Sequence, residues 1–169
     1  TGYTGEDGVE LHVPAAGARS CWQALLAAGL QPAGLAARDT LRLEMGFPLH
    51  GHELGAGITP YEAGLGWVVR ADKGDFRGHD ALRRHESGPA RRLRGLLLDG
   101  RQVPRAGYAV LRDGEQLGEV TSGNFSPTLE RGIALAFLPP DVSEGEVVGV
   151  DVRGRTARAV VVKPPFVHG

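Results

Sequence analysis

The sequence predicts an α+β protein whose first half holds helices and loops and whose second half is a small antiparallel β-structure. Two observations favour this fold class. Residues 14–44 carry apolar positions at helical spacing. From Arg91 onward, short apolar runs alternate with turn residues, which is typical of consecutive short strands. The 169 residues, 41% of them hydrophobic, suffice to bury a core in one domain or two small ones.

The chain should begin with a strand followed by a helix. Apolar and polar residues alternate over residues 9–13, which predicts a strand with one buried face, and Glu10 then points away from the local core. Apolar residues at helical spacing predict a helix over residues 14–28, and Gly29 is a typical helix stop.

A second helix is predicted over residues 34–44. Arg38 and Arg42 are four positions apart, so in a helix they share one face and point the same way. Leu41 and Leu43 cannot both lie on the same face. We expect Leu41, together with Glu44 or Met45, to cover the core.

Loops should dominate the next stretch, with a buried strand over residues 65–69 and a short helix over residues 78–84. The turn-forming residues from Glu86 to Pro89 mark the most suitable domain boundary. The sequence therefore predicts two domains, residues 1–86 and residues 87–169.

The second domain should contain six short strands and two tight hairpins. Asp113-Gly114 and Arg153-Gly154 lie where hairpin turns belong, and the first of these pairs is a strong turn signal. Such a pattern indicates a small antiparallel barrel or sandwich. The predicted strands are residues 93–98, 108–112, 116–121, 133–138, 147–152 and 157–162.

Composition excludes several functional classes. A formal net charge of -1 gives no electrostatic reason to expect nucleic acid or an anionic membrane as partner. Cys21 is the single cysteine, so no internal disulfide forms, and a reducing compartment, the cytoplasm, is expected. No apolar run approaches the roughly 20 residues that span a bilayer. Because the chain opens without Met, in turn-forming residues, we expect a processed piece or a fragment.

Standard catalytic and metal-binding signatures are missing from the sequence. The six histidines include one close pair, His50 and His52, but no cysteine pair or suitably spaced carboxylate completes a metal site, so no metal is expected. The Gly-rich run over residues 1–8 has no Gly-Lys-Ser/Thr ending and precedes a strand. It is interpreted as a tight turn and not as a phosphate cradle.

Glu10 and the two arginines of the second helix are the candidate binding residues. An ionised carboxylate can accept two parallel hydrogen bonds, the pattern that a pterin or guanine edge offers; a solvated surface charge is the alternative. Guanidinium groups such as those of Arg38 and Arg42 suit the carboxylates of a glutamate tail. Ion pairs with Asp39 or Glu44 are the alternative for them.

Three runs of sequence resemble those of a known family. They are TGYTGEDGVE at residues 1–10, GLAARDTLRLE at residues 34–44 and TSGNFSPTL at residues 121–129. Residues 60–67, 75–78 and 163–166 add further agreement. On these runs, which lie in order along essentially the whole chain, the protein resembles the aminomethyltransferases, or T-proteins, of the glycine cleavage system.

The resemblance implies a three-domain cloverleaf, of which this chain would hold the remainder of a folate-binding α+β domain and the C-terminal β-barrel. It implies that an aminomethyl group on the lipoyl arm of the H-protein is delivered to tetrahydrofolate, which releases ammonia and gives methylenetetrahydrofolate. Glu10 would hold the pterin edge with Tyr3 nearby. At least one of Arg38 and Arg42 would contact the cofactor or orient Glu10.

The chain also departs from the family pattern. The family's catalytic aspartate lies in an N-terminal segment that this sequence does not contain, so the catalytic residue is unknown here, and Asp7, Asp39 and Asp75 do not replace it. We therefore expect the chain alone to have little or no transferase activity and weakened folate binding. His50 stands where many relatives have Tyr in a similar Leu-Tyr-Gly stretch, so a contact at that position is in doubt.

Three alternatives stay open at this point. Iron-sulfur-maintenance relatives would carry a Lys-Gly-Cys-Tyr-type motif, and the absence of its cysteine from Lys73-Gly74-Asp75-Phe76 argues against them. The folate-handling end of a dimethylglycine- or sarcosine-oxidising flavoprotein would be identified by an upstream Gly-rich flavin-binding motif. In a non-enzymatic interaction module, Glu10 and the arginines would be surface charges only.

Overall fold

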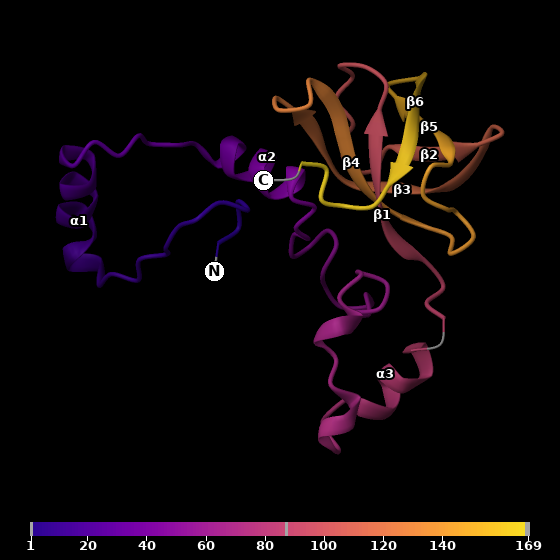
Figure 1. The fold of residues 1–169 in the computed structure, drawn as a ribbon, viewed down its shortest axis with the longest axis horizontal. Coiled ribbons are helices and arrows are strands. Elements are labelled where there is room, and N and C mark those ends of the chain that lie inside the picture. The colour runs from indigo at the N-terminus through magenta and orange to yellow at the C-terminus, as the bar shows by residue number, and fades with distance from the viewer. Residues whose placement is uncertain (1, 87, 168–169) are drawn as a thin grey trace.

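The structure, a computed structural model, describes residues 2–86 and 88–167. Thr1, Ser87, His168 and Gly169 lie outside this range, and with them the first residue of the Gly-rich run and part of the predicted domain boundary. The described chain has three parts (Figure 1): an arm around α1, a closed β-barrel, and a loop-rich lobe that ends in α3. The helix α2 lies between the arm and the barrel.

The arm contains the first predicted helix but not the first predicted strand. Helix α1, Ala15–Ala27, follows Pro14 and precedes Gly29, which has a φ of 91°. The strand prediction over residues 9–13 is wrong, because no described segment pairs with it and Val9 is 84% exposed. Alternation describes only side chains, whereas a strand also needs a neighbouring backbone to take its hydrogen bonds.

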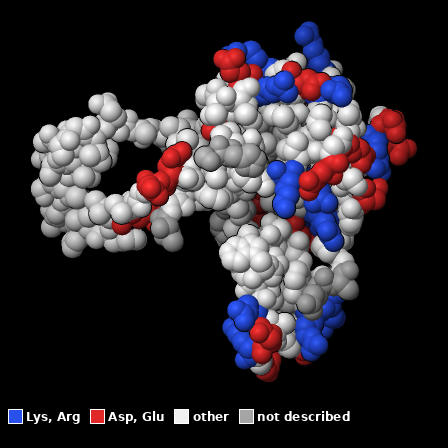
Figure 2. Space-filling view, viewed as in Figure 1, with Lys and Arg blue, Asp and Glu red and all other residues white. Residues whose placement is uncertain are grey.

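Apolar side chains of the arm remain on the surface. Helix α1 has no buried residue, and Trp22 is 53% exposed. In Figure 2 the Lys and Arg side chains gather over the barrel and around α3, whereas most of the arm is white. An apolar surface of this extent is typical of an interaction surface.

Helix α2, Leu35–Glu44, confirms the second helix prediction, but its buried side is not the expected one. Leu43 is fully buried and packs with Ile133 and Leu135, while Leu41 is 37% exposed. The expectation that Leu41 covers the core is therefore wrong, whereas Glu44, which was expected to be buried with it, is 5% exposed. The helix packs on the outer surface of the barrel, and this long-range contact, which the local pattern does not contain, decides which face is buried.

The loop-rich lobe has two short 3-10 helices, η1 (Gly66–Val68) and η2 (Ala71–Lys73), and then α3, His79–Glu86. Helix α3 confirms the short helix prediction. The buried strand predicted over residues 65–69 is wrong: this segment is a tight turn in which Val68 N donates to Leu65 O, and Trp67 is 78% exposed. A short apolar run cannot by itself distinguish a strand from a helical turn.

Six antiparallel strands form a closed barrel in the spatial order β1-β4-β3-β2-β5-β6, with β6 bonded back to β1. All six strand predictions are confirmed, and the closure selects a barrel over a sandwich. The strands are β1 Arg92–Leu98, β2 Ala109–Arg112, β3 Glu115–Ser126, β4 Arg131–Leu138, β5 Val147–Val152 and β6 Arg155–Val162.

Both predicted hairpin turns are present. Asp113 and Gly114 have φ angles of 54° and 86°, and Arg153 and Gly154 have φ angles of 57° and 81°. Two consecutive left-handed residues are what a two-residue turn needs to match the twist of the flanking strands. These turns join β2 to β3 and β5 to β6.

The barrel core explains why β4 reads as a continuous apolar run. Its inward residues Ala134, Ala136 and Leu138 belong to the main core. Its outward residues Ile133 and Leu135 are covered by Leu43 of α2, so both faces of the strand are buried. No helix among the described residues is long and apolar enough to cross a membrane.

Candidate functional site

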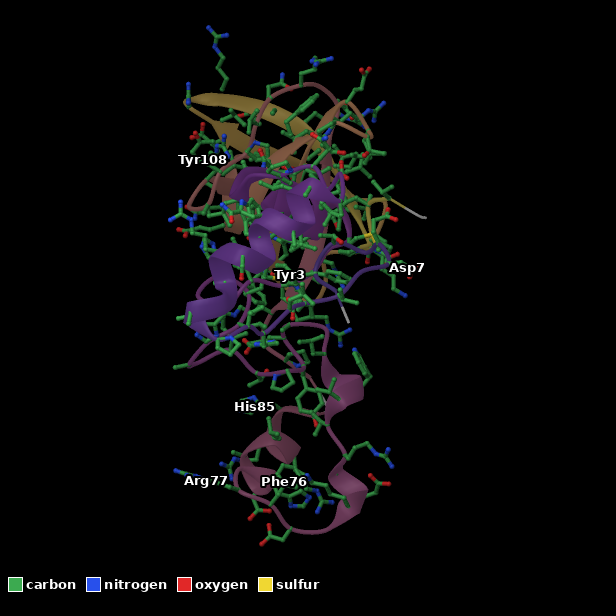
Figure 3. All side chains as sticks on the ribbon, turned by 90° about the vertical axis from the view of Figure 1, so that its left-hand side faces the viewer. Tyr3, Asp7, Phe76, Arg77, His85 and Tyr108 are labelled. Atoms are coloured by element: carbon green, nitrogen blue, oxygen red, sulfur yellow. The ribbon has the colours of Figure 1, made fainter. Side chains whose placement is uncertain are left out.

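Three of the four predicted binding residues meet at one hollow. Tyr3, Glu10 and Arg38 line a space of about 180 Å³ between the N-terminal turn and α2. Arg42 does not line it. Figure 3 shows Tyr3 near the middle of the molecule and Asp7 farther out to one side. The remaining lining residues are Gly2, Thr4, Glu6, Gly8 and Val9.

The N-terminal turn is held close to the end of α2. Gly5 has a φ of 79°, and a Cβ atom there would lie 2.4 Å from Cγ of Met45. Both facts require glycine at this position, because other residues avoid this backbone conformation and the side chain would collide. The interpretation of the Gly-rich run as a tight turn is confirmed for its described residues.

Tyr3 is fixed on three sides. Its hydroxyl donates to Pro48 O at 2.6 Å, its ring stacks on Phe47 with centroids 5.9 Å apart, and the guanidinium carbon of Arg38 lies 4.4 Å from the ring centroid. Burial raises the pKa of Tyr3 above 10.0, against the opposing effect of the positive charges of Arg42 and Arg38. The phenol is therefore a hydrogen-bond donor at neutral pH.

Glu10 is exposed and lies at the rim of the same hollow. No side chain within residues 2–86 and 88–167 forms an ion pair or a hydrogen bond with its carboxylate. The exposed carboxylate is therefore free to accept hydrogen bonds from a ligand at this rim. This arrangement suits a ligand that presents two parallel N–H groups.

Arg38 and Arg42 share a face of α2 as predicted, and both line a second, larger hollow of about 600 Å³ between α2 and the barrel. Their surroundings differ. Arg38 is exposed, whereas Arg42 is 2% exposed and is held by four groups of the protein. Those groups are Asp39 Oδ1 at 2.8 Å, Phe47 O at 3.1 Å, Ser122 Oγ at 2.9 Å and Glu53 Oε2 at 3.6 Å.

Glu53 is a buried carboxylate that sequence reasoning did not single out. It is fully buried, and its Oε2 accepts a hydrogen bond from Leu49 N at 2.9 Å, while its Oε1 has no hydrogen-bond partner in the part of the chain that the structure describes. Nearby, His52 Nδ1 donates to Thr121 O at 2.6 Å. This contact joins two residues that line the larger hollow. No cluster of three metal-binding side chains occurs among the described residues.

Polar residues of β3 that the sequence reasoning also missed bind α2. Ser122, Asn124 and Ser126 alternate along the strand and face the helix. Their partners are Arg42 at 2.9 Å, Thr40 at 3.0 Å and Glu44 at 2.5 Å, respectively. The two runs at residues 34–44 and 121–129, which carry the family resemblance, are thus two sides of one interface. The available signal was the alternation of small polar residues directly after the strand predicted over residues 116–121.

Comparisons with known proteins agree with this architecture. Residues 1–73 match the family model described as the GCVT N-terminal domain, and residues 91–168 match that of the glycine cleavage T-protein C-terminal barrel domain. The aminomethyltransferase of Synechococcus elongatus is 52% identical over 172 residues, which cover 100% of this chain and 46% of that protein. The aminomethyltransferase of Mycobacterium avium is 55% identical over 174 residues, which cover 99% of this chain and 47% of that protein.

A solved structure is also similar. The crystal structure of glycine cleavage system aminomethyltransferase T from Bartonella henselae superposes with a TM-score of 0.92 at 38% sequence identity, over 98% of this chain and 48% of that one. The chain thus spans about half the length of the relatives it matches. Two family models in sequence order, relatives with more than half of the aligned residues identical, and a shared fold establish that the chain belongs to the aminomethyltransferase (T-protein) family of the glycine cleavage system.

Proposed function

We propose that the protein acts in glycine breakdown as an aminomethyltransferase, which passes the methylene group of an aminomethyl-lipoyl carrier to tetrahydrofolate with release of ammonia. The carrier would be the lipoylated H-protein, and the site of action the cytoplasm. Family membership supports the reaction class. The single observation that carries the cofactor assignment is the unpaired Glu10 carboxylate, which shares a hollow with Tyr3 and Arg38.

The residues at this hollow fit tetrahydrofolate. The Glu10 carboxylate would accept two hydrogen bonds from the pterin edge, Tyr3 would lie beside the ring, and the Arg38 guanidinium would meet a carboxylate of the glutamate tail. The hollow measures about 180 Å³, below the roughly 300–1,000 Å³ of a whole ligand pocket. It therefore has room for one ring of the cofactor, while the rest extends past Arg38.

The role of these residues in the reaction is to bind the cofactor and to orient it. Tetrahydrofolate supplies the nitrogen nucleophiles that take up the methylene group. Holding the cofactor in one orientation next to the carrier arm accelerates such a transfer by raising the effective concentration of the reacting atoms. A carboxylate near the reacting nitrogen is also needed for proton handling, and Glu10 is not free for that task while it holds the ring edge.

We therefore expect the 169-residue chain by itself to give little or no transferase activity and to bind folate weakly. Ammonia release from the aminomethyl-loaded carrier measures the activity. Turnover by this chain at the rate of a longer relative, such as the Mycobacterium avium protein, would contradict this expectation.

Glu10→Gln tests the pterin contact. The amide keeps the size of the side chain but replaces one acceptor by a donor, so the dissociation constant of tetrahydrofolate should rise by about 10- to 100-fold, the equivalent of the ~1.5–3 kcal/mol of a charged hydrogen bond. Isothermal titration calorimetry on the full-length protein measures this constant. Asp7→Asn is the matched control, because Asp7 is an exposed carboxylate of the same turn that does not line the hollow. Equal affinities of Glu10→Gln and wild type would remove the proposed contact.

A further inference from the structure

Arg42 uses its whole guanidinium group inside the protein. Nε donates to Asp39 Oδ1 at 2.8 Å, Nη1 donates to Phe47 O at 3.1 Å, and Nη2 donates to Ser122 Oγ at 2.9 Å. At 2% exposure, this cation is almost completely withdrawn from solvent, and each of its three nitrogen atoms donates to a protein group. It joins three parts of the chain: its own helix α2, the turn that follows α2, and strand β3 of the barrel.

The turn that follows α2 connects these contacts of Arg42 to Tyr3, a residue that lines the hollow. Phe47 O accepts from Arg42, and the next carbonyl, Pro48 O, accepts from the Tyr3 hydroxyl at 2.6 Å. The following amide, Leu49 N, donates at 2.9 Å to Glu53, whose Oε2 lies 3.6 Å from Arg42 Nη1. Three consecutive backbone groups are therefore fixed by Arg42, Tyr3 and Glu53.

The same turn also supports two of the side chains that line the hollow. The Phe47 ring stacks against Tyr3, and Tyr3 in turn carries the guanidinium of Arg38 over its face. A shift of the Phe47 backbone therefore moves the Phe47 ring, and with it Tyr3 and Arg38, two side chains that line the hollow. Ser122, on β3 of the barrel, is linked to these residues through Arg42.

We infer that Arg42 is a positioning residue: its guanidinium links Ser122 of the barrel to the backbone of Phe47 and Pro48, and so sets the places of Tyr3 and Arg38 at the hollow. The barrel thereby controls the geometry of a site that lies outside it. The effect on cofactor affinity rests on the proposed binding of tetrahydrofolate at this hollow, whereas the effect on the position of Tyr3 does not.

Two variants separate this role from simple docking of α2 on the barrel. Ser122→Ala removes the hydrogen bond to Arg42. Thr40→Val removes the hydrogen bond from Asn124 Nδ2 to Thr40 Oγ1, 3.0 Å long, which joins the same helix to the same strand but does not reach the turn. Both variants should lower stability to urea by similar amounts, because each breaks one contact of the same interface.

Tetrahydrofolate affinity should distinguish the two variants. In the full-length protein, Ser122→Ala should raise the dissociation constant about 3- to 10-fold, since a buried cation that has lost one partner shifts its remaining contacts. Thr40→Val should leave the constant unchanged, and Ser122→Thr, which restores the hydroxyl, should recover the wild-type value. Equal losses of affinity in Ser122→Ala and Thr40→Val would show general docking and overturn the inference.

A second measurement needs no ligand. With 3-fluorotyrosine incorporated at position 3, the fluorine resonance should shift in Ser122→Ala, stay in place in Thr40→Val, and return in Ser122→Thr. A resonance that moves in neither variant, or equally in both, would overturn the positioning role. Failure of the wild type to bind tetrahydrofolate would count against the proposed function alone, because the fluorine comparison decides the role of Arg42 independently.

Discussion

Glu44 is a charged side chain that the fold has taken almost completely out of water, at 5% exposure. Its carboxylate accepts hydrogen bonds from Ser126 Oγ at 2.5 Å, Thr128 N at 3.3 Å and Thr128 Oγ1 at 3.1 Å. Its backbone carbonyl accepts from Phe166 N at 2.8 Å. A buried carboxylate is tolerated only with such donors, so Glu44 ties the end of α2 to the barrel and to the C-terminal segment.

Replacement of Glu44 should therefore lower the free energy of unfolding, and the loss should grow with the number of donors left without an acceptor. We expect Glu44→Ala to lower the free energy of unfolding by about 2–4 kcal/mol, because Ser126 and Thr128 lose a charged acceptor in a buried place. Glu44→Gln keeps one acceptor oxygen and should cost about 1 kcal/mol. Urea unfolding at pH 7 measures both values. A loss of less than 0.5 kcal/mol, about the size expected at an exposed site such as Glu115, would contradict this reading.

At the scale of single residues, the sequence identified the candidates but not their partners. The shared hollow of Tyr3, Glu10 and Arg38 follows from motifs that the family resemblance had singled out, although their contact with folate stays a prediction. The burial of Arg42 could not be foreseen, because its partner Ser122 is 80 positions away in the chain. Local spacing gave both arginines the same face and could not tell which one the barrel would cover.

Among the elements, those defined by local contacts were predicted and those that need a distant partner were not. Helices α1, α2 and α3 and the hairpins at Asp113-Gly114 and Arg153-Gly154 depend on residues close in sequence. The segment of residues 9–13 has the side-chain pattern of a strand but no backbone beside it. The division at residues 86 and 87 stays a prediction; α3 ends at Glu86 and β1 begins at Arg92.

The docking of α2 on the barrel provides a matched pair of leucines for a test. Leu43 is fully buried against Ile133 and Leu135, whereas Leu41 is 37% exposed on the same helix. We expect Leu43→Ala to lower the free energy of unfolding by about 3 kcal/mol through lost burial and the cavity left behind. Leu41→Ala should cost less than about 1 kcal/mol. Thermal or urea unfolding of the two variants checks the difference, and a larger cost at Leu41 would mean that the opposite face of α2 is buried.

On the scale of the whole molecule, Glu62 joins the loop-rich lobe to the start of the barrel. Its carboxylate accepts from Arg91 Nε at 2.9 Å and from Thr59 N at 2.7 Å, and its carbonyl accepts from Leu93 N at 2.8 Å. Burial, the largest single influence, would raise the pKa of Glu62. The hydrogen bonds from Thr59 and Arg91 outweigh it and hold the pKa below its ordinary value of 4.5.

Because of these contacts of Glu62, the free energy of unfolding should depend on pH in the acidic range. The folded state holds the Glu62 carboxyl in its charged form more strongly than the unfolded chain does, so its contribution is complete above pH 4.5 and is lost as the pH falls through the lowered pKa. Glu62→Gln should therefore destabilise the protein at pH 7 and by less at pH 3.5. Urea unfolding of both proteins at the two pH values checks this, and an equal difference at each pH would contradict it.

The barrel leaves no strand at the end of a sheet, because β6 is bonded to β1 as well as to β5. Every strand of the ring already has a neighbour on each side. A second polypeptide therefore finds no open ladder of amides and carbonyls to extend, which is the usual starting point of amyloid-like stacking. The barrels of two copies therefore cannot join edge to edge, and the exposed large apolar side chains lie mainly on the arm, not on the ring.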